Sequence, residues 1–239
     1  MKNFVIALFA AIALLGMVTG AGAALTFFEQ DFEGMDAGSP SALSANGWLI
    51  FANVFNPGGG YLYGYGVFPA PNGTGAFCAV AVGEGGGAQG AQQLSVYSDY
   101  NNVDHAVGNL IESITFQEQT IVAADVGQTW YFDFDAKLGN LGGATTALAF
   151  IKTLNPAAGY ATTNFITEDM TSTSTSWTGY QLSITIDASL VGQLLQIGFA
   201  NTASNYEGSG VFYDNIYFYV DGTIPAEDVS WGEMKTLFR

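Results

Sequence analysis

The chain has 239 residues, of which 49% are hydrophobic and 11% charged, so it can bury a sizeable core and is not a disordered tail. Five Lys and Arg against 21 Asp and Glu give a formal net charge of −16, which argues against binding to nucleic acid or to an anionic membrane surface. Cations, neutral sugars and other proteins remain as partners.

The N-terminal segment predicts a secretory signal. Lys2 precedes an apolar run over residues 4–18, and the small residues Ala21-Gly22-Ala23 follow it as a cleavage site. We therefore expect residues 1–23 to be removed and the remaining chain to be secreted or held at the cell surface. The alternative is a membrane anchor, but the apolar run is shorter than the ~20 residues that a span needs. We expect no membrane span after signal removal.

Residues 24–221 are expected to form one all-β domain. Short runs rich in Phe, Tyr, Val, Ile and Thr alternate with clusters of Gly, Asn, Pro and Ser, as is typical of a sandwich or barrel. The expected strands cover residues 26–33, 48–55, 61–68, 76–82, 93–98, 110–122, 129–138, 145–153, 164–169, 179–187, 194–201 and 211–220.

Alternation along two of these strands predicts which side chains face the core. In 129–138, Trp130, Phe132 and Phe134 share one face, and acids occupy the other. In 211–220, strict alternation places Asp214 on the same, more apolar face as Phe218.

The single cysteine and the single histidine limit the chemistry. Cys78 lies in an apolar run and is expected to be a buried structural thiol, and one cysteine forms no intrachain disulfide. His105 lies in a polar run without a nucleophile motif, so we expect a surface histidine in a turn.

Two aspartates form a candidate catalytic pair. Asp133 and Asp135 share a strand face, roughly 7 Å apart by strand rise, and glycoside hydrolysis needs two carboxyl groups. Lys137 on the same face favours the plainer interpretation, a solvated surface, and we expect no catalysis.

A cation site is predicted from acids that lack basic neighbours. Glu29, Asp31 and Glu33 fall on one face of the first expected strand, and Asp36 follows. Like charges in a row repel, and a carboxylate on an apolar face, as expected for Asp214, is costly. A bound Ca²⁺ ion would relieve both the repulsion among the acids and the cost of the unpaired Asp214 carboxylate. Alternatively, the acids face water and Asp214 caps a turn or sits at a bulge.

The order of several segments resembles that of carbohydrate-binding modules of the galactose-binding-like jelly-roll type. Residues 31–34 and 47–48 are similar to their opening, 127–137 to a central strand, 176–184 to a later strand, and 211–216 to the closing strand with its aspartate. The resemblance implies a two-sheet antiparallel β-sandwich (jelly roll), non-catalytic binding of an extracellular glycan, and a structural calcium ion. By position, Glu33 and Asp214 would be calcium ligands, with Asp31 and Asp36 as further candidates.

Tyrosines are the candidate sugar platform, because aromatic rings stack on the apolar faces of sugars. Tyr61, Tyr63 and Tyr65 alternate along one expected strand and would line one face of it. The alternative is that they only cover the sandwich. Further candidates are Tyr97, Asn205 and Tyr206.

The tail, residues 222–239, differs from the rest. Trp231, Met234 and Leu237 have the i, i+3 spacing of a short helical face, and a sorting tag or a frayed end are both open. The lone domain and the distinct tail motivate an alternative function, a surface or extracellular-matrix structural protein that assembles with copies of itself.

Overall fold

The computed structural model describes residues 23–73, 77–204 and 206–221. The expected tail and, except for Ala23, the expected signal segment lie outside these residues, so both stay predictions. Within the described part of the chain, a strand forms in each of the twelve expected segments, and the two-sheet antiparallel β-sandwich is confirmed. No helix among the described residues is long and apolar enough to cross a membrane.

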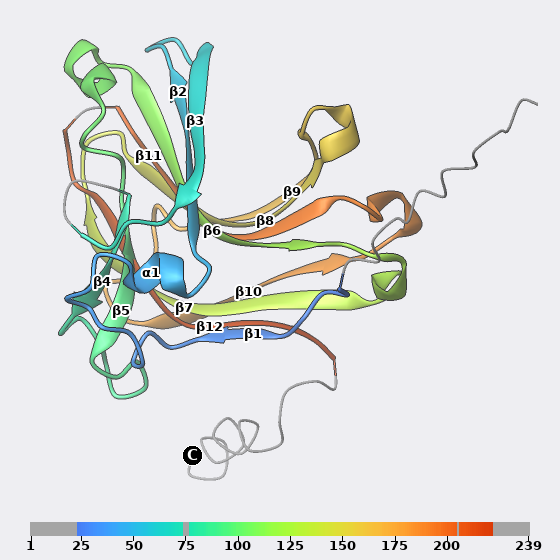
Figure 1. Ribbon diagram of the computed structural model, residues 1–239. Helices are drawn as coiled ribbons and strands as arrows, with labels where there is room; N and C mark the ends of the chain where they lie inside the picture. The colour runs from blue at the N-terminus through green and yellow to red at the C-terminus, as the bar shows by residue number, and fades with distance from the viewer. Residues whose placement is uncertain (1–22, 74–76, 205, 222–239) are drawn as a thin grey trace, which may run out of the picture.

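The first sheet, sheet A, has the strand order β10-β7-β12-β5-β4, and β1 also pairs with β12 (Figure 1). Every pairing is antiparallel. The strands are β1 (Phe28–Gln30), β4 (Cys78–Val82), β5 (Gln92–Val96), β7 (Thr129–Leu141), β10 (Thr178–Thr185) and β12 (Ser209–Val220).

The second sheet, sheet B, has the order β3-β2-β6-β11-β8-β9, again antiparallel throughout. Its strands are β2 (Leu49–Phe55), β3 (Tyr61–Pro69), β6 (Leu110–Thr120), β8 (Thr146–Asn155), β9 (Ala161–Asp169) and β11 (Leu194–Ala203). Short helices connect strands: α1 (Ala42–Ala45), η1 (Val103–Val107), η2 (Ala123–Asp125), η3 (Pro156–Ala158) and η4 (Ala188–Leu190).

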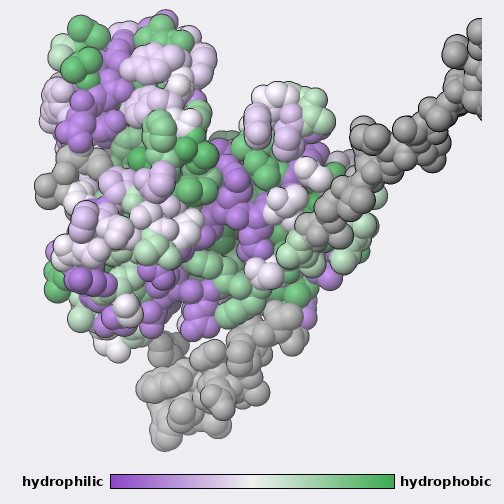
Figure 2. Space-filling view, viewed as in Figure 1, coloured by the Kyte–Doolittle hydropathy of each residue, from purple (hydrophilic) through white to green (hydrophobic). Residues whose placement is uncertain are grey.

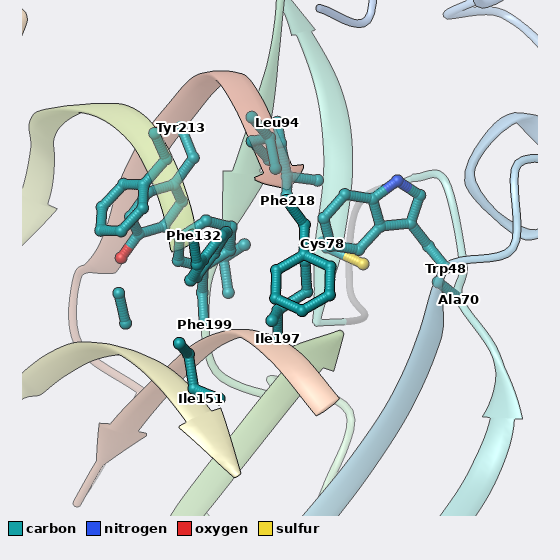
Figure 3. Packing of buried hydrophobic residues seen from close by; sticks show 14 of the residues in the cluster. Trp48, Ala70, Cys78, Leu94, Phe132, Ile151, Ile197, Phe199, Tyr213 and Phe218 are labelled. Carbon is teal, nitrogen blue, oxygen red and sulfur yellow. The ribbon is translucent and has the colours of Figure 1, made fainter. Parts of the chain in front are cut away.

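The core lies between the inner faces of the two sheets and is rich in aromatic rings (Figure 3). The rings of Phe199 on β11 and Tyr213 on β12 stack with centroids 3.6 Å apart, which ties sheet B to sheet A. The predicted alternation of β7 is confirmed, since Phe132 and Phe134 are buried against Phe199. Cys78 is a buried free thiol, as predicted, and burial raises its pKa to about 12.

A bulge in β12 makes the predicted face of Asp214 wrong. The register shifts between Asp214 and Tyr217, and Asn215 takes a left-handed conformation with φ 48°. Asp214 therefore pairs with Asp135 on the outer face of sheet A, whereas Phe218, beyond the bulge, faces the core. Asp214 is nevertheless fully buried, which means that other segments cover this part of the outer face.

The prediction of a surface position for His105 is also wrong. The residue lies in η1 and is buried, with its Nε2 3.3 Å from the Ser98 hydroxyl. The rings of Tyr100 and Tyr206 lie beside it, with centroids 6.3 and 5.1 Å away. Aromatic neighbours thus bury a side chain that the polar composition of the segment suggested would be exposed.

Candidate functional site

A cleft runs across the outer face of sheet B. Its rims are β3 on one side and the turn around η3, ahead of β9, on the other (Figure 1). Figure 2 shows the surface hollowed between these rims. The cleft has a volume of about 660 Å³, enough for a small ligand, and residues from all six strands of sheet B line it.

The floor of the cleft is apolar. Side chains on the outer faces of the central strands β6, β8 and β11 cluster there and are buried: Ile114, Phe116, Phe150 and Ala200. Gly198 lies between them in β11, where an added Cβ would overlap the backbone carbonyl oxygen of Thr115. A glycine therefore keeps this part of the floor low and flat.

Exposed aromatic side chains stand at the rims. Tyr61 on β3 and Tyr160 after η3 both line the cleft, and each is 61% exposed. Tyr160 has φ 62°, so the left-handed turn Gly159-Tyr160 sets the direction of its side chain. Phe165 on β9 is also exposed and lines the same side of the cleft. Rings placed in this way can stack on the flat faces of a ligand.

Polar groups interrupt the apolar floor in two rows. In the first row, Asn53 Nδ2 donates to Glu112 Oε1 at 2.8 Å. In the second row, Gln196 Nε2 donates to Glu118 Oε2 at 2.7 Å. Lys152 on β8 lies directly opposite Gln196 on β11 in the strand register. The cleft thus presents carboxylate, amide and ammonium groups beside aromatic rings, and this combination suits a polyhydroxylated ligand.

The predicted single tyrosine platform on β3 is wrong, because a register shift between Val54 and Phe55 divides the three tyrosines. Tyr61 faces the cleft with its hydroxyl near Gly64. Tyr63 and Tyr65 pair with Val54 and Ala52, whose side chains face the core, and so lie on the opposite face.

The hydroxyls of Tyr63 and Tyr65 are held by the loop between β5 and β6. Tyr63 donates to Asp104 at 2.5 Å and Tyr65 to Asp99 at 2.7 Å. Tyr97 stacks on Tyr100 in that loop and donates to the carbonyl oxygen of Gly73. These contacts favour a structural role, the alternative that the sequence left open.

Tyr206 and Asn205 are the last two predicted ligand-binding residues. The Tyr206 side chain is 55% exposed, and its ring lies beside His105, outside the residues that line the cleft. Asn205 lies outside the described residues. Of the predicted ligand-binding residues that the structure describes, Tyr61 alone lines the cleft.

The first expected strand ends earlier than predicted, which changes the positions of its acids. β1 stops at Gln30, and Phe32 adopts φ 61°, so the predicted common face of Glu29, Asp31 and Glu33 is wrong. Asp36 instead accepts the N–H of Gly38 at 2.9 Å within its own turn.

Asp31 and Glu33 nevertheless lie within electrostatic range of Asp214. The pKa of Asp214 is raised to about 8, mainly by burial and in smaller part by the charges of Asp135, Asp31 and Glu33. Glu33 Oε1 accepts the N–H groups of Ala91 and Gln92 at 2.7 and 2.6 Å, which fixes the loop between β4 and β5 beside these acids. The acids therefore gather where β12, the segment after β1 and this loop meet.

The donor set at Asp214 fits a hard cation in part. Asp214 Oδ1 accepts the N–H of Asn215 at 2.7 Å, but Oδ2 is buried and has no hydrogen-bond partner among the described residues. Such an orphaned carboxylate oxygen is costly without a counter-charge. In the described part of the chain no three His, Cys, Asp or Glu side chains converge as ready-made metal ligands, so Ca²⁺ would also need carbonyl or water oxygens.

Asp133 and Asp135 lie on the outer face of sheet A, on the opposite side of the sandwich from the cleft. Asp133 accepts from Gln181 at 2.9 Å and from Tyr219 at 3.0 Å, and burial raises its pKa. Asp135 accepts from Gln89 at 2.7 Å. Amides and a phenol thus occupy both carboxylates, which favours a structural role over catalysis.

The cleft residues Lys152, Tyr160 and Phe165 were not predicted from the sequence. Lys152 carried a weak signal, because an isolated base within an apolar strand is unusual in a chain with five bases. Tyr160 follows the turn sequence Asn155-Pro156-Ala157-Ala158-Gly159, which orients it in a way that no strand pattern predicts.

No family model and no curated protein matches the chain. Among solved structures, the fold is similar to the enzymatically active domain of bacteriophage CBA120 tailspike protein 4, at 13% identity and TM-score 0.46 over 77% of this chain and 21% of that one. It is similar to the CBM22-1 xylan-binding domain of Paenibacillus barcinonensis, at 14% identity and TM-score 0.42 over 84% and 96%. A family 16 carbohydrate-binding module matches at 14% identity and TM-score 0.38 over 61% and 87%. These identities and scores are too low to carry over a ligand or an activity.

Proposed function

We propose that the chain binds a glycan in the cleft of sheet B without cleaving it. The observation that carries the proposal is the cleft itself, in which an apolar floor lies between exposed aromatic rims and two rows of polar groups. Glycans present flat apolar ring faces for Tyr61 and Tyr160, and hydroxyls for the carboxylates and amides. The acidic net charge does not oppose a neutral sugar.

The spacing of the cleft carboxylates supports binding without hydrolysis. Glu112 and Glu118 lie on one strand, six residues apart, which corresponds to ~20 Å at the usual rise per residue. Glycoside hydrolysis with two carboxyl groups needs them ~5–9.5 Å apart. This pair is therefore suited to accept hydrogen bonds from different sugar units rather than to attack one bond.

The proposal includes export and a structural Ca²⁺ ion. Asp214, with Glu33 and Asp31 beside it, would hold the ion, which would supply the counter-charge that the buried Asp214 lacks. The ion would join β12 to the segment after β1 and would take no part in sugar binding, since the cleft lies on the other sheet. Export rests on the signal segment alone.

Titration of the full exported chain with a panel of defined oligosaccharides tests the proposal. Tyr61→Ala and Tyr63→Ala form a matched pair, because the two residues share β3 but face opposite sides. We expect Tyr61→Ala to weaken binding about tenfold and Tyr63→Ala to leave it nearly unchanged. Chromatography of the sugars afterwards should show no cleavage. The absence of binding to any glycan in the panel would refute the proposal.

A second candidate function, self-assembly, is favoured by the edge strand β3. Residues 61–69 carry no charge, and Leu62, Val67 and Phe68 are exposed on this strand at the edge of sheet B. Uncharged exposed edges can pair with another copy. Sedimentation of the wild type and of Leu62→Lys distinguishes the functions: concentration-dependent oligomers that the lysine abolishes would favour assembly, and a monomer throughout would exclude it.

A further inference from the structure

A smaller side pocket opens from the cleft. It has a volume of about 140 Å³ and shares Asn53, Lys152 and Thr162 with the larger cleft, so the two are continuous. Glu112 and Phe165 complete its polar and aromatic walls. The pocket therefore combines a carboxylate, an ammonium, an amide and a hydroxyl within a space that suits one small group of a ligand.

Lys152 is held in this pocket without a hydrogen-bonding partner. Its Nζ lies 5.0 Å from the centre of the Phe150 ring, and no hydrogen bond or ion pair joins the ammonium to any residue in the described part of the chain. The other described cation, Lys137, is bound to Glu84 at 2.9 Å. Burial lowers the pKa of Lys152, so the protein holds this charge at a cost in free energy.

The charges around Lys152 favour an uncharged partner over an anion. Glu112 and Glu118 are close enough to oppose the effect of burial on Lys152, so the three groups carry a formal charge of −1 together. The whole chain carries −16. A sugar carboxylate or sulfate would meet one positive and two negative charges, whereas a sugar hydroxyl can accept from the ammonium and donate to a carboxylate.

Building on the proposed function, we infer that Lys152 and Glu112 form a donor–acceptor subsite for the hydroxyl groups of one uncharged sugar residue. Lys152 donates to one sugar oxygen, and Glu112, whose Oε1 is already held by Asn53, accepts from a hydroxyl through its remaining lone pairs. The pair determines specificity, while the rim aromatics supply contact area. Glycans that carry a uronic acid or a sulfate at this position are rejected.

Calorimetric titrations of the full chain test the inference with two sets of oligosaccharides, one neutral and one containing uronic acids, at low and high salt. Lys152→Met keeps the aliphatic stem and Glu112→Gln keeps the shape, so both variants should fold. Lys137→Met removes the same charge on sheet A and serves as the control, with folding of every variant checked by melting temperature. We expect both cleft variants to weaken neutral binding about tenfold or more, and Lys137→Met to leave it unchanged.

The outcomes separate the inference from the proposed function. Tighter binding of the acidic set, lost at high salt and in Lys152→Met, would show that the ammonium pairs with an anion and would overturn the inference while glycan binding stands. Neutral binding that Lys152→Met leaves within about twofold of the wild type would overturn it as well. If neither set binds the wild type, the proposed function fails and the inference fails with it.

Discussion

Chelation of calcium should lower the melting temperature of the chain if Asp214 and the acids beside it hold the ion. An ion that binds only the folded state stabilises it by ~2.7 kcal/mol at a hundredfold excess over Kd. For a domain of ~150–250 residues, 1 kcal/mol corresponds to ~2–4 °C, so removal should lower the melting temperature by about 5–10 °C. The physical reason is the buried Oδ2 of Asp214, which has no partner among the described residues.

The assay is circular dichroism melting with 1 mM Ca²⁺ or excess EGTA as the two conditions. Asp214→Asn should lose the calcium-dependent difference, because the amide removes the charge at the centre of the proposed site. Asp36→Asn is the matched control: this side chain accepts the N–H of Gly38 in its own turn, and an amide oxygen can do the same. Equal melting temperatures in both conditions for the wild type, or a full calcium response in Asp214→Asn, would contradict the calcium proposal.

Two further predictions concern buried polar groups. The Tyr213 hydroxyl is buried without a hydrogen-bond partner in the described part of the chain, so Tyr213→Phe should raise the free energy of unfolding by about 1 kcal/mol. Tyr180→Phe removes a 2.7 Å hydrogen bond to Thr173 and should lower the free energy of unfolding by a similar amount. Urea unfolding in which both variants change stability in the same direction would refute this. Burial lowers the pKa of His105, so the unfolded chain takes up a proton first as pH falls below ~6.5, and stability should fall with it. The melting temperature of His105→Gln should lose that part of the pH dependence, and identical pH profiles for the two proteins would contradict the reasoning.

The strands could be predicted from the sequence because their signal is local. Alternating β-branched and aromatic residues between turn residues mark each segment, and β7 matched its predicted faces residue by residue. The faces of Asp214 and Tyr61 could not be predicted, because each depends on a bulge whose position is set by the register with the partner strand.

The cleft itself could not be predicted, because it exists only across strands. Lys152, Gln196 and Glu118 come together through the pairing of β8, β11 and β6, although they are far apart in the chain. The alternation of side chains along each strand predicts only the face of the strand on which each of these residues lies. Strand order, which the sequence does not encode locally, decides that these sides form one surface.

The most direct measurement compares Tyr160→Ala with Tyr206→Ala in titrations with a glycan that binds the wild type. Both tyrosines are similarly exposed, at 61% and 55%, but Tyr160 lines the cleft and Tyr206 lies beside His105. Binding in the cleft predicts that Tyr160→Ala weakens affinity about tenfold or more and that Tyr206→Ala changes it less than about twofold. The reverse order of effects would place the sugar at the loop around Tyr206 and contradict the account.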